Sequence, residues 1–303
     1  MDWSKVAMGL WWVVLTFYYC LESLVMLVVP SKYRRKDVRG SVVLVTGGGS
    51  GIGRLMCLKF AARGALVVTW DVSETDNRET ARLVQGAGGQ CRAYTVDLCD
   101  RHAVYAVATK VKQEVGKVDI LINNAGIVTG KPLMHCPDSS IIRTFEVNTL
   151  AHFWTTKAFL GDMMVRNKGH IVTVASILGK TPVNNLVDYC SSKYAAVGFD
   201  ESLRIELKAL GKSGIKTTVV CPGLINTGMF DGIANTPSVE PDHVAEEVVN
   251  AVELNVTVLY VPYLAKIHLI LKTILPEKSF YKMLELLGAT RAMDSFVGRH
   301  KTN

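Results

Sequence analysis

Cysteine patterns typical of metal sites or disulfide frameworks are absent from this 303-residue sequence. The seven cysteines are scattered, odd in number and nowhere spaced like metal ligands. We therefore expect reduced thiols in a reducing compartment, and no metal. Internal repeats and low-complexity segments are also missing, which favours one folded catalytic domain.

A long basic patch of the kind that binds nucleic acid is missing too, although the net charge is +7. The densest basic cluster is SKYRRKDVR, residues 31–39, which directly follows an apolar run. This position favours an anionic membrane surface as the partner, and we predict no nucleic acid. Hydrophobic residues make up 49% of the chain, which is high for a soluble domain.

The apolar run covers residues 6–29 and contains one charge, Glu22. About 20 apolar residues span a bilayer, so the run predicts a membrane anchor. A cleaved signal peptide is disfavoured because a basic region beyond Lys5 and an A-x-A cleavage site are missing. Near the membrane centre, Glu22 would cost about 2.5–3.5 kcal/mol. The anchor therefore either spans with Glu22 near one headgroup layer or forms a shallow hairpin that does not cross.

The basic cluster also predicts an orientation. Its positive side chains should stay in the cytosol, together with everything that follows them. We expect an anchor at residues 1–30 and a linker at residues 31–39, in the endoplasmic reticulum membrane or on lipid droplets.

Beyond the linker, short β-rich apolar runs alternate with longer helical stretches. The expected strands lie at residues 41–47, 66–71, 91–97, 118–124, 170–176, 215–221 and 256–262. This alternation is typical of a parallel sheet with helices on both faces. We therefore predict an α/β fold, a Rossmann-type doubly wound parallel sheet, over residues 40–262.

A C-terminal apolar helical extension is expected over residues 263–303. Its first part places apolar side chains at helical spacing: Leu264, Ile267, Ile270, Leu271 and Ile274. One interpretation is a helix packed on the core. The other is an interfacial membrane helix or a lid over an apolar substrate.

The segment TGGGSGIG, residues 46–53, lies between the first expected strand and the first helix. Glycines there allow close backbone approach, and the helix N-terminus offers N–H groups to a phosphate. Asp71 ends the next strand, where its carboxylate can bind ribose hydroxyls and repel a 2′-phosphate. Positions 50 and 72, which could carry a basic residue for a 2′-phosphate, are Ser50 and Val72 here. We therefore predict NAD rather than NADP.

Tyr189 and Lys193 lie four residues apart in DYCSSKYAAVGF and so share one helix face. A tyrosine can bind the oxygen of an alcohol, but its unperturbed pKa near 10 is too high for efficient base catalysis. A neighbouring lysine cation favours the phenolate. Ser176, at the carboxyl end of a strand, could hold the same oxygen as charge develops.

These motifs, with NNAG at residues 123–126, occur in an order that resembles the short-chain dehydrogenase/reductase family. The resemblance covers residues 40–262 and implies a homo-oligomer. The catalytic residues that it implies are Ser176, Tyr189, Lys193 and Asn148. The cofactor-binding residues that it implies are Thr46, Gly47, Ser50, Gly51, Ile52, Gly53, Asp71, Asp97, Asn124, Gly126, Tyr189, Lys193, Pro222 and Thr227.

The segment of residues 224–241 corresponds to the variable substrate cover of the family and is apolar here. We expect Met229 and Phe230, with Ser176, to contact the substrate. HFWTTKAFL, GHIVTVAS, GIKTTVVCP, TGMF and the tail ILPEKSFYKMLELLGATRAMDSFVG resemble a membrane-bound subgroup of retinol and 17β-hydroxysteroid dehydrogenases.

The resemblance to this subgroup implies oxidation of a lipophilic alcohol, with all-trans-retinol going to retinaldehyde, by NAD at the cytosolic face. One alternative is a steroid or other lipid alcohol, and another is a non-enzymatic lipid-droplet or membrane interaction protein. The glycosylation sequon at Asn255 precedes an expected core strand, so we predict that it is unmodified.

Overall fold

The computed structural model describes residues 2–233 and 237–298, in two compact units divided between Asp37 and Val38. The first unit contains α1 (Trp3–Val28) and the short helix η1 (Ser31–Tyr33). None of the 26 residues of α1 is buried. At 1.5 Å per residue, α1 is about 39 Å long. Length and composition therefore make it a candidate membrane span within the described residues.

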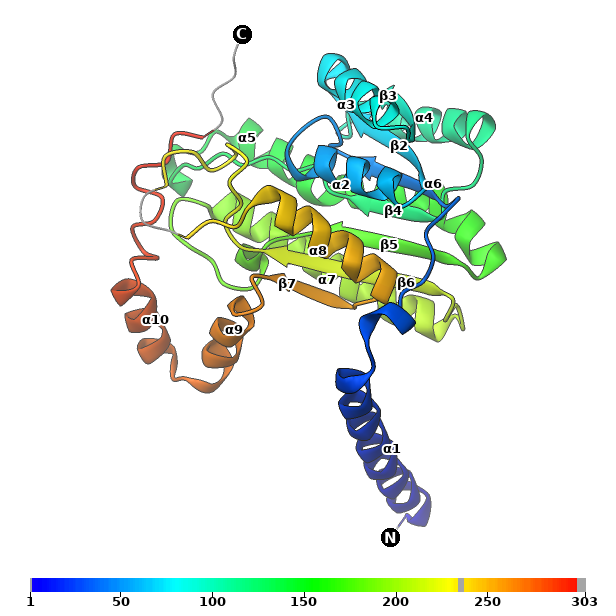
Figure 1. The fold of residues 1–303 in the computed structure, drawn as a ribbon. Helices are drawn as coiled ribbons and strands as arrows, with labels where there is room; N and C mark the ends of the chain where they lie inside the picture. The colour runs from blue at the N-terminus through cyan, green and yellow to red at the C-terminus, as the bar shows by residue number, and fades with distance from the viewer. Residues whose placement is uncertain (1, 234–236, 299–303) are drawn as a thin grey trace. The chain divides into compact units, whose positions relative to one another are not determined.

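The second unit contains a seven-stranded sheet in which every neighbouring pair is parallel (Figure 1). Its strands are β1 (Val42–Thr46), β2 (Leu66–Asp71), β3 (Gln90–Thr95), β4 (Ile120–Asn123), β5 (Gly169–Val174), β6 (Ile215–Pro222) and β7 (Val258–Val261). Each lies within or overlaps one of the seven strands expected from the sequence. The predicted α/β fold is therefore confirmed.

Helices cover both faces of this sheet (Figure 1). Their bounds are α2 (Gly51–Ala62), α3 (Glu74–Gly86), α4 (Arg101–Glu114), α5 (Asp138–Phe145), α6 (Ala151–Arg166), α7 (Val187–Ala209), α8 (Pro241–Leu254), α9 (Ala265–Ile274) and α10 (Glu277–Leu286). Val43 and Ile122 pack with residues of α2, α3 and α8 on one face. Leu44 and Leu121 pack with residues of α4, α6 and α7 on the other. The strands are apolar on both faces, as buried parallel strands must be.

The strand order is β3-β2-β1-β4-β5-β6-β7, so the direction of winding reverses after β3. The chain first moves outward from β1 to β3 and then returns to place β4 on the other side of β1. The segments that follow β1 and β4 therefore separate at the carboxyl edge of the sheet. Ligands of doubly wound sheets bind in the crevice that this reversal opens.

Most of the apolar stripe of α9 is exposed, although Leu271 is half-buried. The exposed fractions are 49% for Ile267, 48% for Ile270 and 72% for Ile274. By contrast, the polar Lys272 Nζ donates to the Lys180 carbonyl oxygen at 2.6 Å and lies 2.8 Å from the Tyr194 hydroxyl. A helix packed on the core through its apolar face is therefore not observed. Residues 299–303 of the predicted extension lie outside the described residues, as do residues 234–236 of the predicted substrate segment.

Candidate active site

The glycine-rich turn after β1 is closely packed against the start of α2. Gly47 and Gly51 have φ angles of +64° and +53°, which favour glycine. A Cβ added at Gly53 would lie 2.0 Å from the Gly47 carbonyl oxygen. The first turn of α2 also carries no acidic residue. A bare helix N-terminus beside a tight glycine turn fits the pyrophosphate of a dinucleotide.

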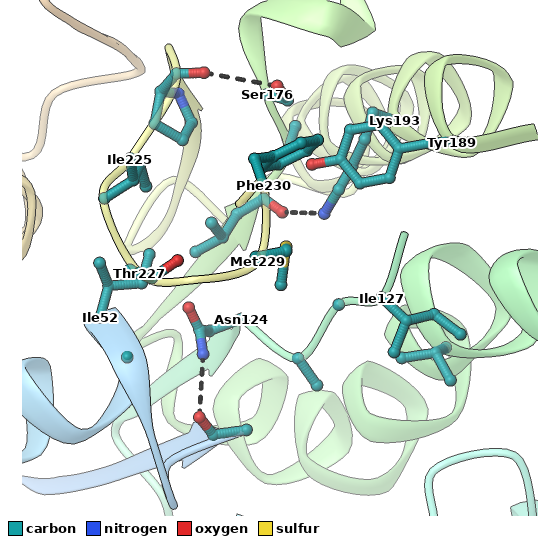
Figure 2. Close-up of a pocket in the computed structure, with 18 of the residues that line it drawn as sticks. Ile52, Asn124, Ile127, Ser176, Tyr189, Lys193, Ile225, Thr227, Met229 and Phe230 are labelled. Atoms are coloured by element: carbon teal, nitrogen blue, oxygen red, sulfur yellow. Dashed lines mark hydrogen bonds between the residues drawn. The ribbon is translucent and has the colours of Figure 1, made fainter. Parts of the chain in front are cut away.

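The turns after β1 and β4 are joined by hydrogen bonds (Figure 2). Asn124 Nδ2 donates to the carbonyl oxygens of Thr46 at 2.9 Å and Gly47 at 3.3 Å. In return, Thr46 Oγ1 accepts from the backbone N–H groups of Asn124 at 3.0 Å and Ala125 at 3.1 Å. These bonds hold the two sides of the crevice in a fixed relation.

Asp71 ends β2 at the rim of the crevice. Its Oδ2 accepts from the Gly49 N–H at 2.9 Å, and its Oδ1 accepts from the Ser73 N–H at 3.0 Å. Val72 beside it is 61% exposed. The carboxylate is therefore held in place next to the glycine-rich turn, with an uncharged neighbour.

Asp97 lies further along the same rim and has a partner that the sequence did not indicate. Its Oδ1 accepts from the Cys99 N–H at 3.0 Å, and its Oδ2 lies 3.7 Å from Arg143 Nη2. Arg143 comes from α5 and lines the same cavity. No motif marks this arginine, so only the folded chain reveals it.

Ser176 stands just beyond β5 and is buried. Its hydroxyl donates to the Pro222 carbonyl oxygen at 3.4 Å and accepts from the Leu178 N–H at 3.1 Å (Figure 2). The Ser176 hydroxyl also lies near enough to Tyr189 to lower the pKa of the tyrosine. The end of β5 and the start of α7 thus bring the two hydroxyl groups together.

Tyr189 and Lys193 lie on one face of α7, and both are buried. Lys193 Nζ is 5.7 Å from the centre of the Tyr189 ring and donates to the Val174 carbonyl oxygen at 2.9 Å (Figure 2). Burial raises the pKa of Tyr189, while the neighbouring Ser176 hydroxyl lowers it. Burial lowers the pKa of Lys193 to about 8. Both shifts have the same cause, since desolvation disfavours each charged form.

Asn148 lies in η3 (Glu146–Leu150), a π-helical turn between α5 and α6, rather than in regular α-helix. Its Oδ1 accepts from the Ile127 N–H at 2.8 Å. Its Nδ2 donates to the Ile127 carbonyl oxygen at 2.9 Å and to Ser192 Oγ at 3.0 Å. The amide is fully buried and connects the turn after β4 with α7. Such π-helical turns are frequent at functional sites.

A cavity of about 430 Å³ joins these features. It is lined by most of the predicted residues: Gly47, Ser50, Gly51, Ile52, Gly53, Asp71, Asp97, Asn124, Gly126, Ser176, Tyr189, Lys193, Pro222, Thr227, Met229 and Phe230. Thr46 and Asn148 are not in the lining. They lie behind it and hold lining residues through the hydrogen bonds described above.

One end of the cavity is apolar and lies over Tyr189. Figure 2 shows Phe230 beside the Tyr189 hydroxyl; the two ring centres are 5.5 Å apart, at 85°. This end is also lined by residues outside the predicted set: Leu178, Val183, Leu186, Ile233, Ala292 and Met293. Ala292 and Met293 belong to the C-terminal tail. The sequence of this part of the tail supported a family resemblance but predicted no contact with the site.

Comparison with known proteins agrees with this geometry. The family model described as "short chain dehydrogenase" matches residues 41–238. Human epidermal retinol dehydrogenase 2 is 44% identical, covering 94% of each chain. Mouse estradiol 17-beta-dehydrogenase 11 is 45% identical, covering 87% of this chain and 89% of the relative. A crystal structure of an actinorhodin polyketide ketoreductase variant with NADPH is 30% identical, with a TM-score of 0.68, covering 73% of this chain and 95% of that one.

Proposed function

The chain belongs to the short-chain dehydrogenase/reductase family of NAD(P)-dependent oxidoreductases, and we propose that it oxidises a lipophilic alcohol with NAD. The proposed substrate is all-trans-retinol, the product is retinaldehyde, and the reaction takes place at the cytosolic face of a membrane. One observation carries this proposal. Ser176, Tyr189 and Lys193 line one cavity whose end over Tyr189 is apolar.

When bound, the oxidised cofactor supplies a positively charged nicotinamide ring that accepts a hydride from the alcohol carbon. The hydroxyl proton must leave as well, so a base has to reach the alcohol oxygen. We assign this step to Tyr189, whose phenolic oxygen can accept the proton. Ser176 lines the same cavity beside Tyr189 and is assigned to hold the substrate oxygen as its charge changes.

The environment of Tyr189 explains why a cation is needed. Burial raises the pKa of Tyr189, which opposes base catalysis at neutral pH. Lys193 brings an ammonium group to 5.7 Å from the centre of the tyrosine ring. Burial lowers the pKa of Lys193 only to about 8, so the ammonium form still predominates at neutral pH. We therefore propose that charged Lys193 favours the Tyr189 phenolate.

Asn148 is the proposed positioning residue for Lys193. A Cβ built on Gly126 would lie 3.4 Å from both Asn148 Oδ1 and Lys193 Nζ. The buried amide and the ammonium therefore both approach Gly126. This arrangement supports a path by which a proton leaves the site through Lys193 and the neighbourhood of Asn148.

NAD is proposed over NADP because of Asp71. Its carboxylate is held at the rim and would repel a 2′-phosphate, and exposed Val72 offers no compensating charge. Replacing Asp71 by alanine together with Val72→Arg should raise kcat/KM for NADP relative to NAD. An unchanged cofactor ratio would refute the ribose role of Asp71.

The substrate class is proposed from the apolar end of the cavity and from the relatives. Leu178, Val183 and Leu186 lie near Tyr189, where the body of the alcohol would bind. The human relative is named as a retinol dehydrogenase, which favours a retinoid. The mouse relative is named as an estradiol dehydrogenase, so a steroid alcohol is the second candidate.

Two features independently support membrane association. The apolar helix α1 has no buried residue, and the apolar side of α9 is exposed. The basic cluster that includes Arg34 and Arg35 favours a cytosolic catalytic domain. We propose the endoplasmic reticulum membrane or lipid droplets as the location, and a homo-oligomer as the assembly.

The first test measures NAD-dependent oxidation of all-trans-retinol by membranes that contain wild type or Tyr189→Phe, with estradiol assayed in parallel. Tyr281→Phe is the matched control, since this ring is exposed on α10. Retinaldehyde from wild type and Tyr281→Phe, but not from Tyr189→Phe, is the expected result.

Other results of this test would change the proposal in different ways. Equal turnover by Tyr189→Phe would refute the role of Tyr189. Estradiol oxidation without retinaldehyde would keep the mechanism and change the substrate. Failure of wild type with both alcohols would contradict the proposed substrates and favour the non-enzymatic interaction protein.

A further inference from the structure

The chain after α10 returns to the candidate active site. Met293 is 3% exposed and packs with Leu186, Tyr189 and Cys190. Figure 1 shows this part of the tail, in red, beside the yellow segment that follows β6. We define residues 292–298 as the C-terminal strap.

Hydrogen bonds attach the strap to the segment that carries Phe230. The N–H groups of Val297 and Gly298 donate to the Asp231 carbonyl oxygen at 2.9 and 3.0 Å. Asn184 Nδ2 also donates to Asp294 Oδ1, at 3.1 Å. The strap is therefore connected on two sides to elements that surround the cavity.

Two glycines allow the strap to approach closely. Gly130 has a φ of +69°, and a Cβ there would lie 1.9 Å from Phe296 Cε1. Gly232 has a φ of +90°, and a Cβ there would lie 2.3 Å from the Ser295 carbonyl oxygen. No other residue type fits at these positions without displacing the strap. The surface around the two glycines is therefore complementary to the strap.

Three aromatic rings form a row from the proposed base to the strap. Tyr189 contacts Phe230 with ring centres 5.5 Å apart, and Phe230 contacts Phe296 with ring centres 6.3 Å apart. Phe230 lies beside the Tyr189 hydroxyl, where the alcohol must bind (Figure 2). The room available to a substrate therefore depends on Phe230, and the position of Phe230 depends on Phe296.

We infer that Met293 and Phe296 are specificity-determining residues that limit the width of the apolar part of the alcohol. This inference rests on the proposed function. Met293 does so as part of the cavity wall, and Phe296 does so through Phe230. Neither Met293 nor Phe230 donates a hydrogen bond from its side chain, so the part of the wall that they form suits a hydrocarbon. Shortening Met293 creates space next to Tyr189, and shortening Phe296 creates space into which Phe230 can move.

The test compares kcat/KM for estradiol, a wide and rigid alcohol, with that for all-trans-retinol, a narrow one, using full-length protein and NAD. Met293→Ala and Phe296→Ala should each raise the estradiol-to-retinol ratio by about tenfold, the scale on which apolar pockets discriminate. Met293→Leu conserves volume and should keep the wild-type ratio. The matched control is Leu287→Ala, at a side chain that is 62% exposed on the same tail.

The dissociation constant for NAD is measured for every variant. An unchanged constant with a changed ratio supports the inference. A ratio that stays at the wild-type value in both alanine variants would overturn it. So would an equal fall for both alcohols together with weaker NAD binding, because that pattern indicates general loss of structure.

A separate measurement distinguishes failure of the inference from failure of the proposed function. If wild type oxidises neither alcohol, retinol binding is followed by retinol fluorescence in Tyr189→Phe protein with NAD. Adding Met293→Ala should then weaken retinol binding by about tenfold, since contacts with the wall are lost. An unchanged dissociation constant would overturn the inference independently of turnover.

Discussion

Replacing Lys193 by methionine is expected to stabilise the folded protein near neutral pH and to abolish turnover. Lys193 is 3% exposed, and burial lowers its pKa from 10.5 to about 8. A tenfold change in proton affinity is worth about 1.4 kcal/mol, so burial of the ammonium costs about 3 kcal/mol. Methionine is unbranched and apolar and avoids this cost. The Val174 carbonyl oxygen loses its donor in the variant, which offsets about 1–2 kcal/mol of the gain.

The stabilisation should depend on pH because only the charged lysine is penalised. The folded protein releases this proton near pH 8, whereas the unfolded chain holds it until about pH 10.5. Between these values the unfolded state binds more protons, so stability rises with pH. From about pH 7.5 to about pH 10, the free energy of unfolding of wild type should gain about 2 kcal/mol from this group. Lys193→Met should lack this rise.

The assay is urea unfolding of the full-length protein in detergent at both pH values, followed by far-ultraviolet circular dichroism. Lys208→Met is the control, because Lys208 is exposed on the same helix, and it should keep the wild-type dependence on pH. Parallel profiles for wild type and Lys193→Met would refute the reasoning about burial. Retinol turnover by Lys193→Met would refute the proposed role in catalysis.

Three further changes test other parts of the structure. Gly53→Ala should weaken NAD binding by more than about tenfold in calorimetric titration, because the new Cβ would lie 2.0 Å from the Gly47 carbonyl oxygen; wild-type affinity would show that the turn tolerates a side chain. Asn124→Ala loses its bond to the Thr46 carbonyl oxygen and should lower the free energy of unfolding by about 1–3 kcal/mol in urea, and an unchanged value would contradict this. Glycosidase treatment should not change the mass of the protein, because Asn255 caps α8 just before β7; a shift that disappears in Asn255→Gln would overturn the cytosolic orientation.

The sequence alone determined the fold class and the order of the strands along the chain. Short runs rich in β-branched residues alternate with helical stretches, and such patterns depend on local periodicity that survives without any tertiary information. The glycine turn and Asp71 were also found this way, because their spacing follows from one strand, one turn and one helix. Tyr189 and Lys193 are four positions apart, which is about one helical turn, so their common face could be predicted without the structure.

Only the tertiary structure shows which residues that are distant in the sequence are in contact. Met293 reaches Tyr189 although about a hundred residues separate them, and Arg143 reaches Asp97 from another helix. No local pattern encodes such pairs, because periodicity states which face of an element is apolar and not which element covers it. The helix α9 shows the same limit, since its apolar stripe was visible in the sequence but its outward direction was not. The contact of Lys272 with the Lys180 carbonyl oxygen, from the opposite side of the helix, is likewise a long-range pair that no local pattern encodes.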